Sequence, residues 1–423
     1  MHPDAPANSA ASSPPAGMLV VTVDRLPAWM LPAFGATWVA TPAIDALAAR
    51  GLVFDRVITP AADSVATLHD LAFAGETGCA GGTGGPSPIQ AAIARGWKPV
   101  LVTDDAAAAD QLAPCGMEKV LVAAATKAAE AADDAATEVA RLVDAAVDLL
   151  RAGGHRLVWC HVASLGVAWD APRKHRERYV DPEDPPPPAG AGVPSFAVDA
   201  DTDPDLLVGM RQVFAGQLSL LDAQLGRLFE FVAAADWTVL LAGVRGMPLG
   251  LHGWVGVGGP DDAHGELVHV PAILVDAGGR MAAQRFGGLV VPADLGATLA
   301  ELVAGEPAGQ PPRDPAAPWR GASLAGLLRD WSAMPRDRVV VVAGNSVAIV
   351  TPSWHCLSTR GDAAPAGGRR VRLFAKPDDF FECNDVADRC PAVTEPLADL
   401  LAREAHGDGR ALWLARLPEA PPA

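Results

Sequence analysis

The chain has 423 residues, of which 50% are hydrophobic, so it is long enough for one large core or for a large and a small domain. Its formal net charge of −17 argues against a nucleic-acid partner, because the phosphate backbone carries the same sign. No apolar run reaches the length of a membrane span, which argues against a membrane partner. The opening sequence "MHPDAPANSAASSPPAG" has neither the basic start nor the apolar stretch of a signal peptide. We therefore expect residues 1–16 to form a disordered tail.

The cysteines indicate a reducing environment. None of them belongs to a C-x-x-C pair, so a zinc site is not expected. Without an export signal, reduced thiols and a cytoplasmic location are the prediction. The six positions are Cys79, Cys115, Cys160, Cys356, Cys383 and Cys390.

Predicted strands and helices alternate through the first part of the sequence. "MLVVTVD" is predicted to be the first core strand. Residues 41–51 follow as a helix, with Thr41 as its cap, Pro42 in its first position and Gly51 as its stop. "LVFDRVIT" then reads as a strand, and "PIQAAIARGWKPVLVTDD" as a helix, a glycine stop and a strand. Residues 131–160 repeat that order of helix, glycines and strand.

A long amphipathic helix is predicted over residues 211–234, where apolar residues recur at a spacing of 3.6. The strand after it, within "DWTVLLAGVRGMPLGLHGW", is predicted to end at the turn glycine Gly243. Helices that alternate with short apolar strands are typical of a mostly parallel sheet covered by helices on both faces. The predicted fold class is therefore α/β for a domain over residues 17–332.

Two regions differ from this alternation of helices and strands. Residues 173–205 are rich in proline and charge, so they are predicted to form a surface loop, and this loop is the expected contact surface for a partner. From residue 333 to residue 423 the sequence carries short strands separated by turns. A closing helix is predicted there with Thr394 as its cap and Pro396 in its first turn. These features predict a small antiparallel α+β subdomain packed on the larger domain.

The order of these segments resembles the sulfatase family, within the alkaline-phosphatase superfamily. "VVTVDRLPAWMLPAFG…TPAIDALAARGLVFDRV" is similar to the opening of that family, in which an aspartate-bearing strand precedes "TPNLDALAARGVRF". "GQLSLLDAQLGRLFEFV", "TVLLAGVRG" and "ELVHVPAILV" continue the likeness. "LFAKPDDFFECNDVADRCPAVTEPLADLLA" resembles the family's "ELYDLENDPGELNNLAD" tail. The resemblance implies a sulfatase-like sheet and spans nearly the whole chain.

The same resemblance implies that the catalytic nucleophile is missing. Sulfatases use a cysteine matured to formylglycine in a C-x-P-S-R motif. Counting back from Gly75 in "DSVATLHDLAFAG" places that position on Val65 and the motif's arginine on His69. A count shifted by one residue would place Ser64 there. Ser64 and Thr67 are thus the alternative nucleophiles, although hydroxyls at the start of a helix are ordinary caps.

The family's metal ligands are also replaced. Its Asp-His pair after the late strand falls on Val244 and Arg245. Asp24 is retained on the first strand, but the next position, often a second carboxylate, is Arg25. A guanidinium roughly 5 Å from a divalent cation would repel it by about 6–7 kcal/mol at an effective dielectric of 20. No metal is therefore expected, and Asp24 is predicted to pair with Arg25 or Arg245.

Three sulfate-handling positions of the family are changed as well. The lysine and histidine of "GKWH" fall on Asp104 and Ala106, the histidine of "DPHAPY" on Gly166, and a late lysine on Val257. His252 remains in that late motif. Asp104 and its neighbour Asp105 are read as surface acids or as a helix N-cap. An anion pocket that exchanges lysines for aspartates no longer suits sulfate.

The remaining candidates have ordinary structural interpretations. "DDAHGE" imitates a metal motif, but its place in the chain favours a solvated turn for Asp262 and His264. Cys383 and Cys390 are read as inert thiols in the tail.

Together these substitutions predict a pseudo-sulfatase with a binding or regulatory role and no cofactor. The expected binding residues are Arg25, His69, Arg245 and His252, for a small polar ligand or a protein partner, with a homo-oligomer as one option. The alternative is a divergent metal-dependent hydrolase of sulfate or phosphate esters. It would hold calcium or magnesium and rebuild its site from Asp24, Ser64 or Thr67, His69, Asp104, Asp105 and His252.

Overall fold

The computed structural model describes residues 15–75, 87–123, 129–233, 235–260, 262–305, 320–328, 336–363, 369–403, 412–413 and 415–417. Most of the predicted N-terminal tail and the predicted boundary at residue 332 lie outside these ranges. No helix in the described ranges is long and apolar enough to cross a bilayer.

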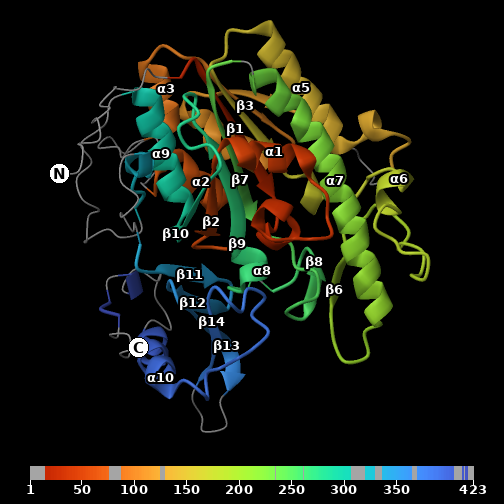
Figure 1. Cartoon of the computed structure of the whole chain (residues 1–423), viewed down its shortest axis with the longest axis vertical. Helices are drawn as coiled ribbons and strands as arrows, with labels where there is room; N and C mark the ends of the chain where they lie inside the picture. Colours follow the sequence, from red (N-terminus) through yellow and green to blue (C-terminus); the bar gives the residue numbers. More distant parts are fainter. Residues whose placement is uncertain are drawn as a thin grey trace, which may run out of the picture.

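An eight-stranded sheet forms the centre of the larger domain (Figure 1). Its strands lie in the order β10-β2-β9-β7-β1-β5-β3-β4, and only β9 runs antiparallel to its neighbours. The predicted mostly parallel sheet is thereby confirmed. The strands are β1 (Gly17–Asp24), β2 (Leu52–Ile58), β3 (Pro99–Thr103), β4 (Glu118–Leu121), β5 (Leu157–Val162), β7 (Trp237–Arg245), β9 (His269–Val275) and β10 (Gln284–Val290).

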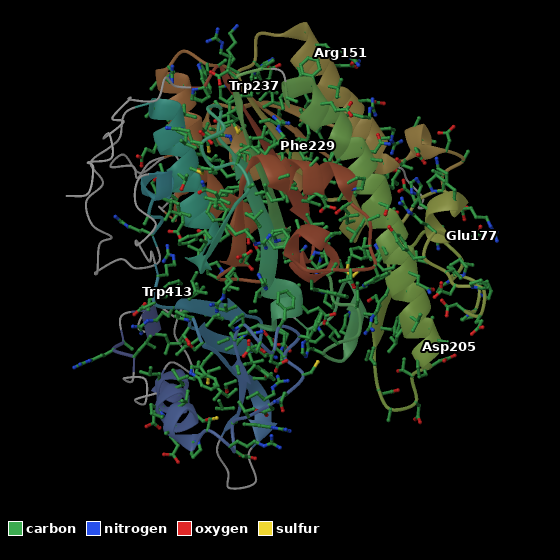
Figure 2. All side chains as sticks on the ribbon, in the orientation of Figure 1. Arg151, Glu177, Asp205, Phe229, Trp237 and Trp413 are labelled. Carbon is green, nitrogen blue, oxygen red and sulfur yellow. The ribbon has the colours of Figure 1, made fainter. Side chains whose placement is uncertain are left out.

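Helices cover both faces of this sheet. The helices α1 (Pro42–Arg50), α5 (Glu138–Ala152) and α7 (Pro204–Ala233) bury their apolar residues in one core cluster. On the other face lie α2 (Ser64–Phe73), α3 (Pro88–Ala94), α4 (Ala106–Leu112) and α9 (Pro292–Ala304). Figure 2 shows Arg151 of α5, Glu177 next to α6 and Asp205 of α7 on the outer side of the layer that contains α5 and α7, and all three are exposed. Burying apolar stripes on both sides is what a parallel sheet requires.

A smaller antiparallel sheet forms the C-terminal subdomain below the larger domain in Figure 1. It contains β11 (Val339–Ala343), β12 (Ser346–Val350), β13 (Trp354–Ala363) and β14 (Arg369–Ala375), with α10 (Pro391–Arg403) packed on it. The predicted antiparallel sheet with one helix is confirmed. Short elements complete the larger domain. α6 (Arg173–Arg176) packs on α7, β6 (Ser195–Ala197) pairs with β8 (Trp254–Gly256), and α8 (Gly265–Val268) directly precedes β9.

Several predicted boundaries were wrong. β7 continues past Gly243 to Arg245, because the strand pairs with β1 up to its last residue. α7 begins at Pro204 rather than at residue 211. α10 begins at Pro391, so Thr394 lies inside it and donates its hydroxyl to the carbonyl of Cys390 at 3.0 Å, and Pro396 is also within the helix.

The cap of α1 comes from a distant part of the chain. Thr41 makes no side-chain cap hydrogen bond, contrary to the prediction. Instead the backbone N–H groups of Ala43 and Ile44 donate to the two carboxylate oxygens of Asp222, at 3.1 and 2.8 Å. Asp222 is buried on α7, so one carboxylate both caps α1 and fixes it against α7.

Replacing Asp222 by alanine should therefore lower the free energy of unfolding by about 2 kcal/mol, because two backbone donors lose their partner in a buried place. Urea unfolding followed by circular dichroism measures this. Asp144→Ala is the matched control, since Asp144 pairs with Arg227 at the surface, and it should change stability by less than about 0.5 kcal/mol. Equal effects of the two substitutions would contradict the capping role.

Residues 173–205 lie mostly at the surface, and two of their side chains anchor them to the domain. The buried Arg176 donates to the carbonyl oxygens of Trp169, Pro188 and Gly190. The hydroxyl of Tyr179 lies 2.6 Å from that of Ser219 on α7. Deleting this segment would therefore take away a buried arginine and the packing of α6 on α7.

One cysteine departs from the prediction of reduced thiols. Cys115 is disulfide-bonded. Cys160, Cys356, Cys383 and Cys390 are free. Disulfides persist mainly in oxidising compartments, so this bond does not support the predicted cytoplasmic location.

Candidate functional site: a charged cleft at the strand ends

A cleft of about 320 Å³ lies over the carboxyl ends of β1, β3, β5 and β7. Open α/β sheets commonly bind ligands at this edge. Most of the positions predicted from the sequence meet here, although they lie far apart in the chain. The lining residues include Asp24, Arg25, Ser64, Asp104, Asp105, Gly166, Arg245 and Val257.

The centre of the cleft is an ion pair between β1 and β7. Arg245 Nε and Nη2 donate to the two carboxylate oxygens of Asp24 at 2.8 and 3.0 Å. The register of the two strands shifts at this point, so that Asp24 is paired with Arg245 while Val244 turns into the core. Asp24 is buried, which makes the bidentate partner essential for its charge. The predicted pairing of Asp24 is confirmed, with Arg245 as the main partner.

Arg25 also lies beside Asp24 in the cleft. It follows β1 in the left-handed region, with φ of 64°, and its Nε lies 4.0 Å from Asp24 Oδ2. A Cβ at Gly166 would lie 3.3 Å from Arg25 Cγ, so a side chain there would crowd the arginine. The position that the family fills with histidine is thus occupied by the arginine stem. Asp24 consequently has two guanidinium groups beside it.

Two aspartates after β3 form the opposite wall. Asp104 accepts a hydrogen bond from the backbone N–H of Ala163 at 2.7 Å, and burial raises the pKa of this carboxyl. Asp105 accepts from the backbone N–H of Ala107, so it is the N-cap of α4, as the sequence suggested. The side chain of His161, whose Nε2 lies 3.8 Å from Asp105 Oδ2, holds the pKa of Asp105 below its usual value. His161, which the sequence reasoning missed, lies fully buried beneath this wall.

The candidate nucleophile positions lie at the start of α2 and differ in whether they line the cleft. Ser64 lines the cleft, whereas Val65 and His69 do not. His69 instead packs on Phe73 of the same helix, with ring centroids 4.6 Å apart. Thr67 is buried and donates its hydroxyl to the carbonyl of Asp63 at 2.8 Å, which is an ordinary helix contact. Ser64 is therefore the only one of the four that faces the cleft.

No family model and no curated protein matches the sequence. The phosphonate monoester hydrolase of Agrobacterium radiobacter superposes with a TM-score of 0.68 at 18% identity, over 95% of this chain and 96% of that one. A 2-O GAG sulfatase gives 0.66 at 14%, over 97% and 96%, and a putative sulfatase from Bacteroides fragilis gives 0.63 at 12%, over 97% and 100%. The chain has the sulfatase fold.

Sulfatase-fold enzymes hold a divalent cation at these strand ends, as the sequence resemblance implies, and the residues present do not fit one. Both oxygens of Asp24 are engaged by Arg245, and Arg25 adds a second positive charge within 4.0 Å. A calcium ion needs six or more oxygen ligands and would meet two guanidinium groups instead. The acidic wall does not replace the lost ligands, because Asp104 and Asp105 each accept a backbone N–H.

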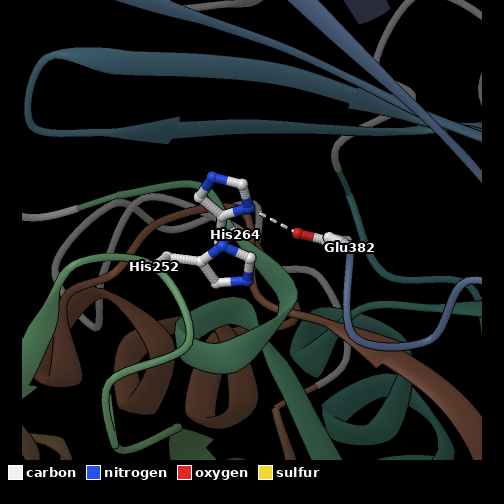
Figure 3. Close-up of side chains that lie close together, drawn as sticks. All are labelled: His252, His264 and Glu382. Carbon is white, nitrogen blue, oxygen red and sulfur yellow. Dashed lines mark hydrogen bonds and ion pairs between the residues drawn. The ribbon is translucent and has the colours of Figure 1, made fainter. Parts of the chain in front are cut away.

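A second cluster lies where the sulfatase-fold domain meets the C-terminal subdomain (Figure 3). His252 does not line the cleft but stacks on His264, with ring centroids 3.7 Å apart and an interplanar angle of 5°. His264 is only 1% exposed, which corrects the prediction of a solvated turn. Asp262 remains partly exposed, with one carboxylate oxygen 3.9 Å from His264 Nε2.

This cluster also fails as a metal centre. His252, His264 and Glu382 offer ligand atoms within 4.8 Å of one another. A metal lies close to the plane of each imidazole that binds it, about 2.0–2.1 Å from the nitrogen. Two parallel rings stacked face to face share no such position. Burial lowers the pKa of His252 to about 4, so the stack is held by neutral imidazole at that residue.

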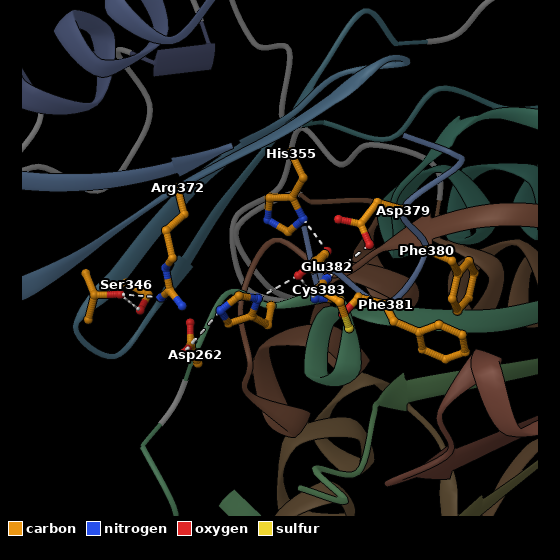
Figure 4. A network of polar contacts seen from close by, with 12 residues as sticks. Asp262, Ser346, His355, Arg372, Asp379, Phe380, Phe381, Glu382 and Cys383 are labelled. Carbon is orange, nitrogen blue, oxygen red and sulfur yellow. Dashed lines mark hydrogen bonds and ion pairs between the residues drawn. The ribbon is translucent and has the colours of Figure 1, made fainter. Parts of the chain in front are cut away.

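Glu382 instead acts as a buried clamp between the two parts of the molecule (Figure 4). Its Oε2 lies 2.6 Å from His264 Nδ1 and accepts the N–H of Gly265, both from the larger domain. Its Oε1 lies 2.6 Å from His355 Nδ1 and 2.9 Å from Lys376 Nζ, both from the subdomain. Sequence reasoning missed Glu382, although it occupies the glutamate position of the quoted tail motif "ELYDLENDPGE". That match was the signal that could have found it.

Proposed function

We propose that this sulfatase-fold protein does not hydrolyse esters and instead binds a small polar ligand in the charged cleft. The observation that carries the proposal is the bidentate pair between Asp24 and Arg245. It places a fixed cation at the strand ends where the fold otherwise supports a metal site. The nucleophile position Val65 and the changed positions Gly166 and Val257 point the same way.

The charges of the cleft favour a ligand with both signs. Arg25 and Arg245 lie on one wall and Asp104 and Asp105 on the other. A zwitterion, such as a molecule with an ammonium and a carboxylate group, would place each charge against the opposite wall. A regulatory role through a protein partner or a second copy of the chain is compatible with this proposal. In that case the segment 173–205 would have to act in its packed form.

The alternative is a divergent hydrolase of sulfate, phosphate or phosphonate esters. One observation favours it, since Ser64 faces the cleft near Asp104 and Asp105. A serine nucleophile needs a base or a metal, and the two histidines assigned to this site, His69 and His252, lie elsewhere. The alternative therefore has a nucleophile without an evident activator among the described residues.

Metal content separates the two functions. The purified protein, after incubation with calcium, magnesium, manganese and zinc and removal of excess ion, is expected to carry well below one equivalent of any of them by mass spectrometry. Aryl sulfate, phosphate and phosphonate monoesters should remain unhydrolysed above background. A stoichiometric ion, or turnover that disappears in both Asp24→Ala and Ser64→Ala, would establish the hydrolase instead.

A further inference from the structure

A larger cavity, of about 480 Å³, lies apart from the charged cleft. It lies between the β2 and β10 end of the central sheet and the C-terminal subdomain, and it shares no lining residue with the cleft. Arg56, Arg285 and Gly287 line it from the sheet, while Val350, Lys376 and Phe380 line it from the subdomain. Its volume lies within the range of small-molecule sites.

Most charges on its wall are neutralised inside the protein. Arg285 pairs with Asp55. Lys376 directs its ammonium group to the carbonyls of Asp379 and Phe380 and to Glu382. These groups are held by the fold and leave no net charge for a ligand.

Arg56 is different. Its Nη1 and Nη2 each donate to a backbone carbonyl, of Pro352 and Thr351, at 2.7 Å. Within the described ranges no carboxylate pairs with it, and partial burial lowers the pKa of its guanidinium without an opposing acid. A guanidinium has five N–H donors, so donors remain for a further acceptor. A half-buried cation without a counter-charge is the feature of this wall that the fold itself does not explain.

The rest of the cavity is apolar. Phe34, Ile58, Val268, Val350, Pro377 and Phe380 contribute to its lining. Phe380 belongs to the same loop as Glu382, so the clamp described above holds this wall in place (Figure 4). An apolar body and one anionic group are therefore the complementary features of a ligand.

We propose that this cavity binds a small amphiphilic organic anion, with its carboxylate, sulfonate, sulfate or phosphate group at Arg56 and its aryl or alkyl body against Phe380 and the neighbouring apolar wall. This binding site is independent of the ligand proposed for the cleft. Arg56 supplies a planar, permanently charged donor set that suits such oxyanions. Its two bonds to the subdomain carbonyls orient the guanidinium before the ligand arrives.

The test uses two probes that share one aromatic body. The first is 8-anilinonaphthalene-1-sulfonate, and the second is its neutral analogue N-phenyl-1-naphthylamine, each titrated against the full-length protein by fluorescence and by calorimetry. Arg56→Met keeps an unbranched, flexible side chain and removes the charge. We expect it to weaken binding of the sulfonate at least tenfold and to change binding of the neutral probe by less than twofold.

A second pair of variants tests the location without touching Arg56. A Cβ at Gly287 would have no atom within 4 Å and its φ is not positive, so Gly287→Phe should fill the cavity without straining the strand. Gly192 has the same open surroundings and does not line the cavity, so Gly192→Phe is the matched control. Gly287→Phe should abolish binding of both probes, and Gly192→Phe should leave both unchanged.

Three results would overturn the proposal. They are retention of sulfonate binding in Gly287→Phe, equal weakening of both probes in Arg56→Met, and absence of any sulfonate binding to the wild type up to 1 mM (roughly −4 kcal/mol). Melting temperatures of all variants accompany the titrations. If Arg56→Met does not fold, Arg56→Lys, which keeps the charge, and Gly287→Phe decide the question.

Discussion

Replacement of Glu382 by glutamine should lower the free energy of unfolding by about 3–5 kcal/mol, because it removes a buried negative charge from beside positive partners. The carboxylate contacts His264 and Gly265 of the larger domain and His355 and Lys376 of the subdomain. Glutamine has nearly the same shape, so the loss reports the charge and not a cavity. Glu382 also has a φ of 55°, a region that a residue other than glycine occupies only when its surroundings hold it there.

The effect of this substitution should depend on pH. Burial acts to raise the pKa of Glu382, but the charge of His355, the hydrogen bonds from both histidines and the charge of Lys376 outweigh it and hold the pKa well below the usual 4.5. A carboxyl whose pKa is lowered by folding stabilises the protein above its unfolded-state pKa, and this contribution is lost as the pH falls below it. The stability difference between wild type and Glu382→Gln should thus be constant near neutrality and shrink below about pH 4.5.

Denaturant unfolding at pH 7 and at several values down to pH 3.5 measures both predictions. Glu395→Gln is the control, since Glu395 is an exposed residue on α10 of the same subdomain, and it should change stability by less than about 0.5 kcal/mol. If Glu382→Gln were as stable as the wild type at pH 7, the carboxyl group of Glu382 would not be ionised in the folded protein at that pH.

The second large effect is expected at the centre of the cleft. Arg245→Met should destabilise the protein by about 3–5 kcal/mol, because it leaves the buried carboxylate of Asp24 without its bidentate partner. The double variant Asp24→Asn with Arg245→Met removes both charges and should recover most of that loss. Arg25 keeps Asp24 from being wholly isolated in the single variant, which places the expected loss at the lower end of the range.

Thermal and urea unfolding of the two single variants and the double variant measure this coupling. Arg151→Ala serves as the control, since its pair with Asp148 is exposed on α5 and should contribute almost nothing. Additive effects of Asp24→Asn and Arg245→Met would be incompatible with a coupled ion pair. Recovery in the double variant would show that the two charges can be removed together with little loss of stability, and loss of ligand binding in the same variant would show that they serve recognition.

The sequence was sufficient for the fold because its signals were local and numerous. Apolar strands, helix stops such as Gly51 and the order of segments identified the parallel sheet and the antiparallel subdomain. The cleft was also largely predictable, since Asp24, Asp104 and Arg245 all stand at strand ends that a parallel sheet brings to one edge. His252 and His69 were misplaced because position in a motif does not define which side of a helix or loop a side chain takes.

Contacts between distant segments were not predictable. The cap of α1 is Asp222, 178 residues away from Ile44, and no local pattern distinguishes it from the nearby Thr41. His264 was expected in solvent because "DDAHGE" is polar. Its side chain is instead buried and contacts the carboxylate of Glu382, 118 residues later in the chain. Arg176 was expected to be exposed, because it lies in a segment rich in proline and charge. It is buried instead, and its guanidinium donates hydrogen bonds to three backbone carbonyls.

The separation of the clamp residues has a consequence for biosynthesis. A ribosome releases the chain from its N-terminus, so β1 to β10 have all emerged while Glu382 is still being made or lies within the exit tunnel. Until Glu382 emerges, His264 and the N–H of Gly265 lack their acceptor. The part of the larger domain that packs on the subdomain is then exposed to solvent. The nascent larger domain must therefore wait, partly open, for about one hundred further residues, and we expect it to depend on chaperones during that interval more than its regular sheet would suggest.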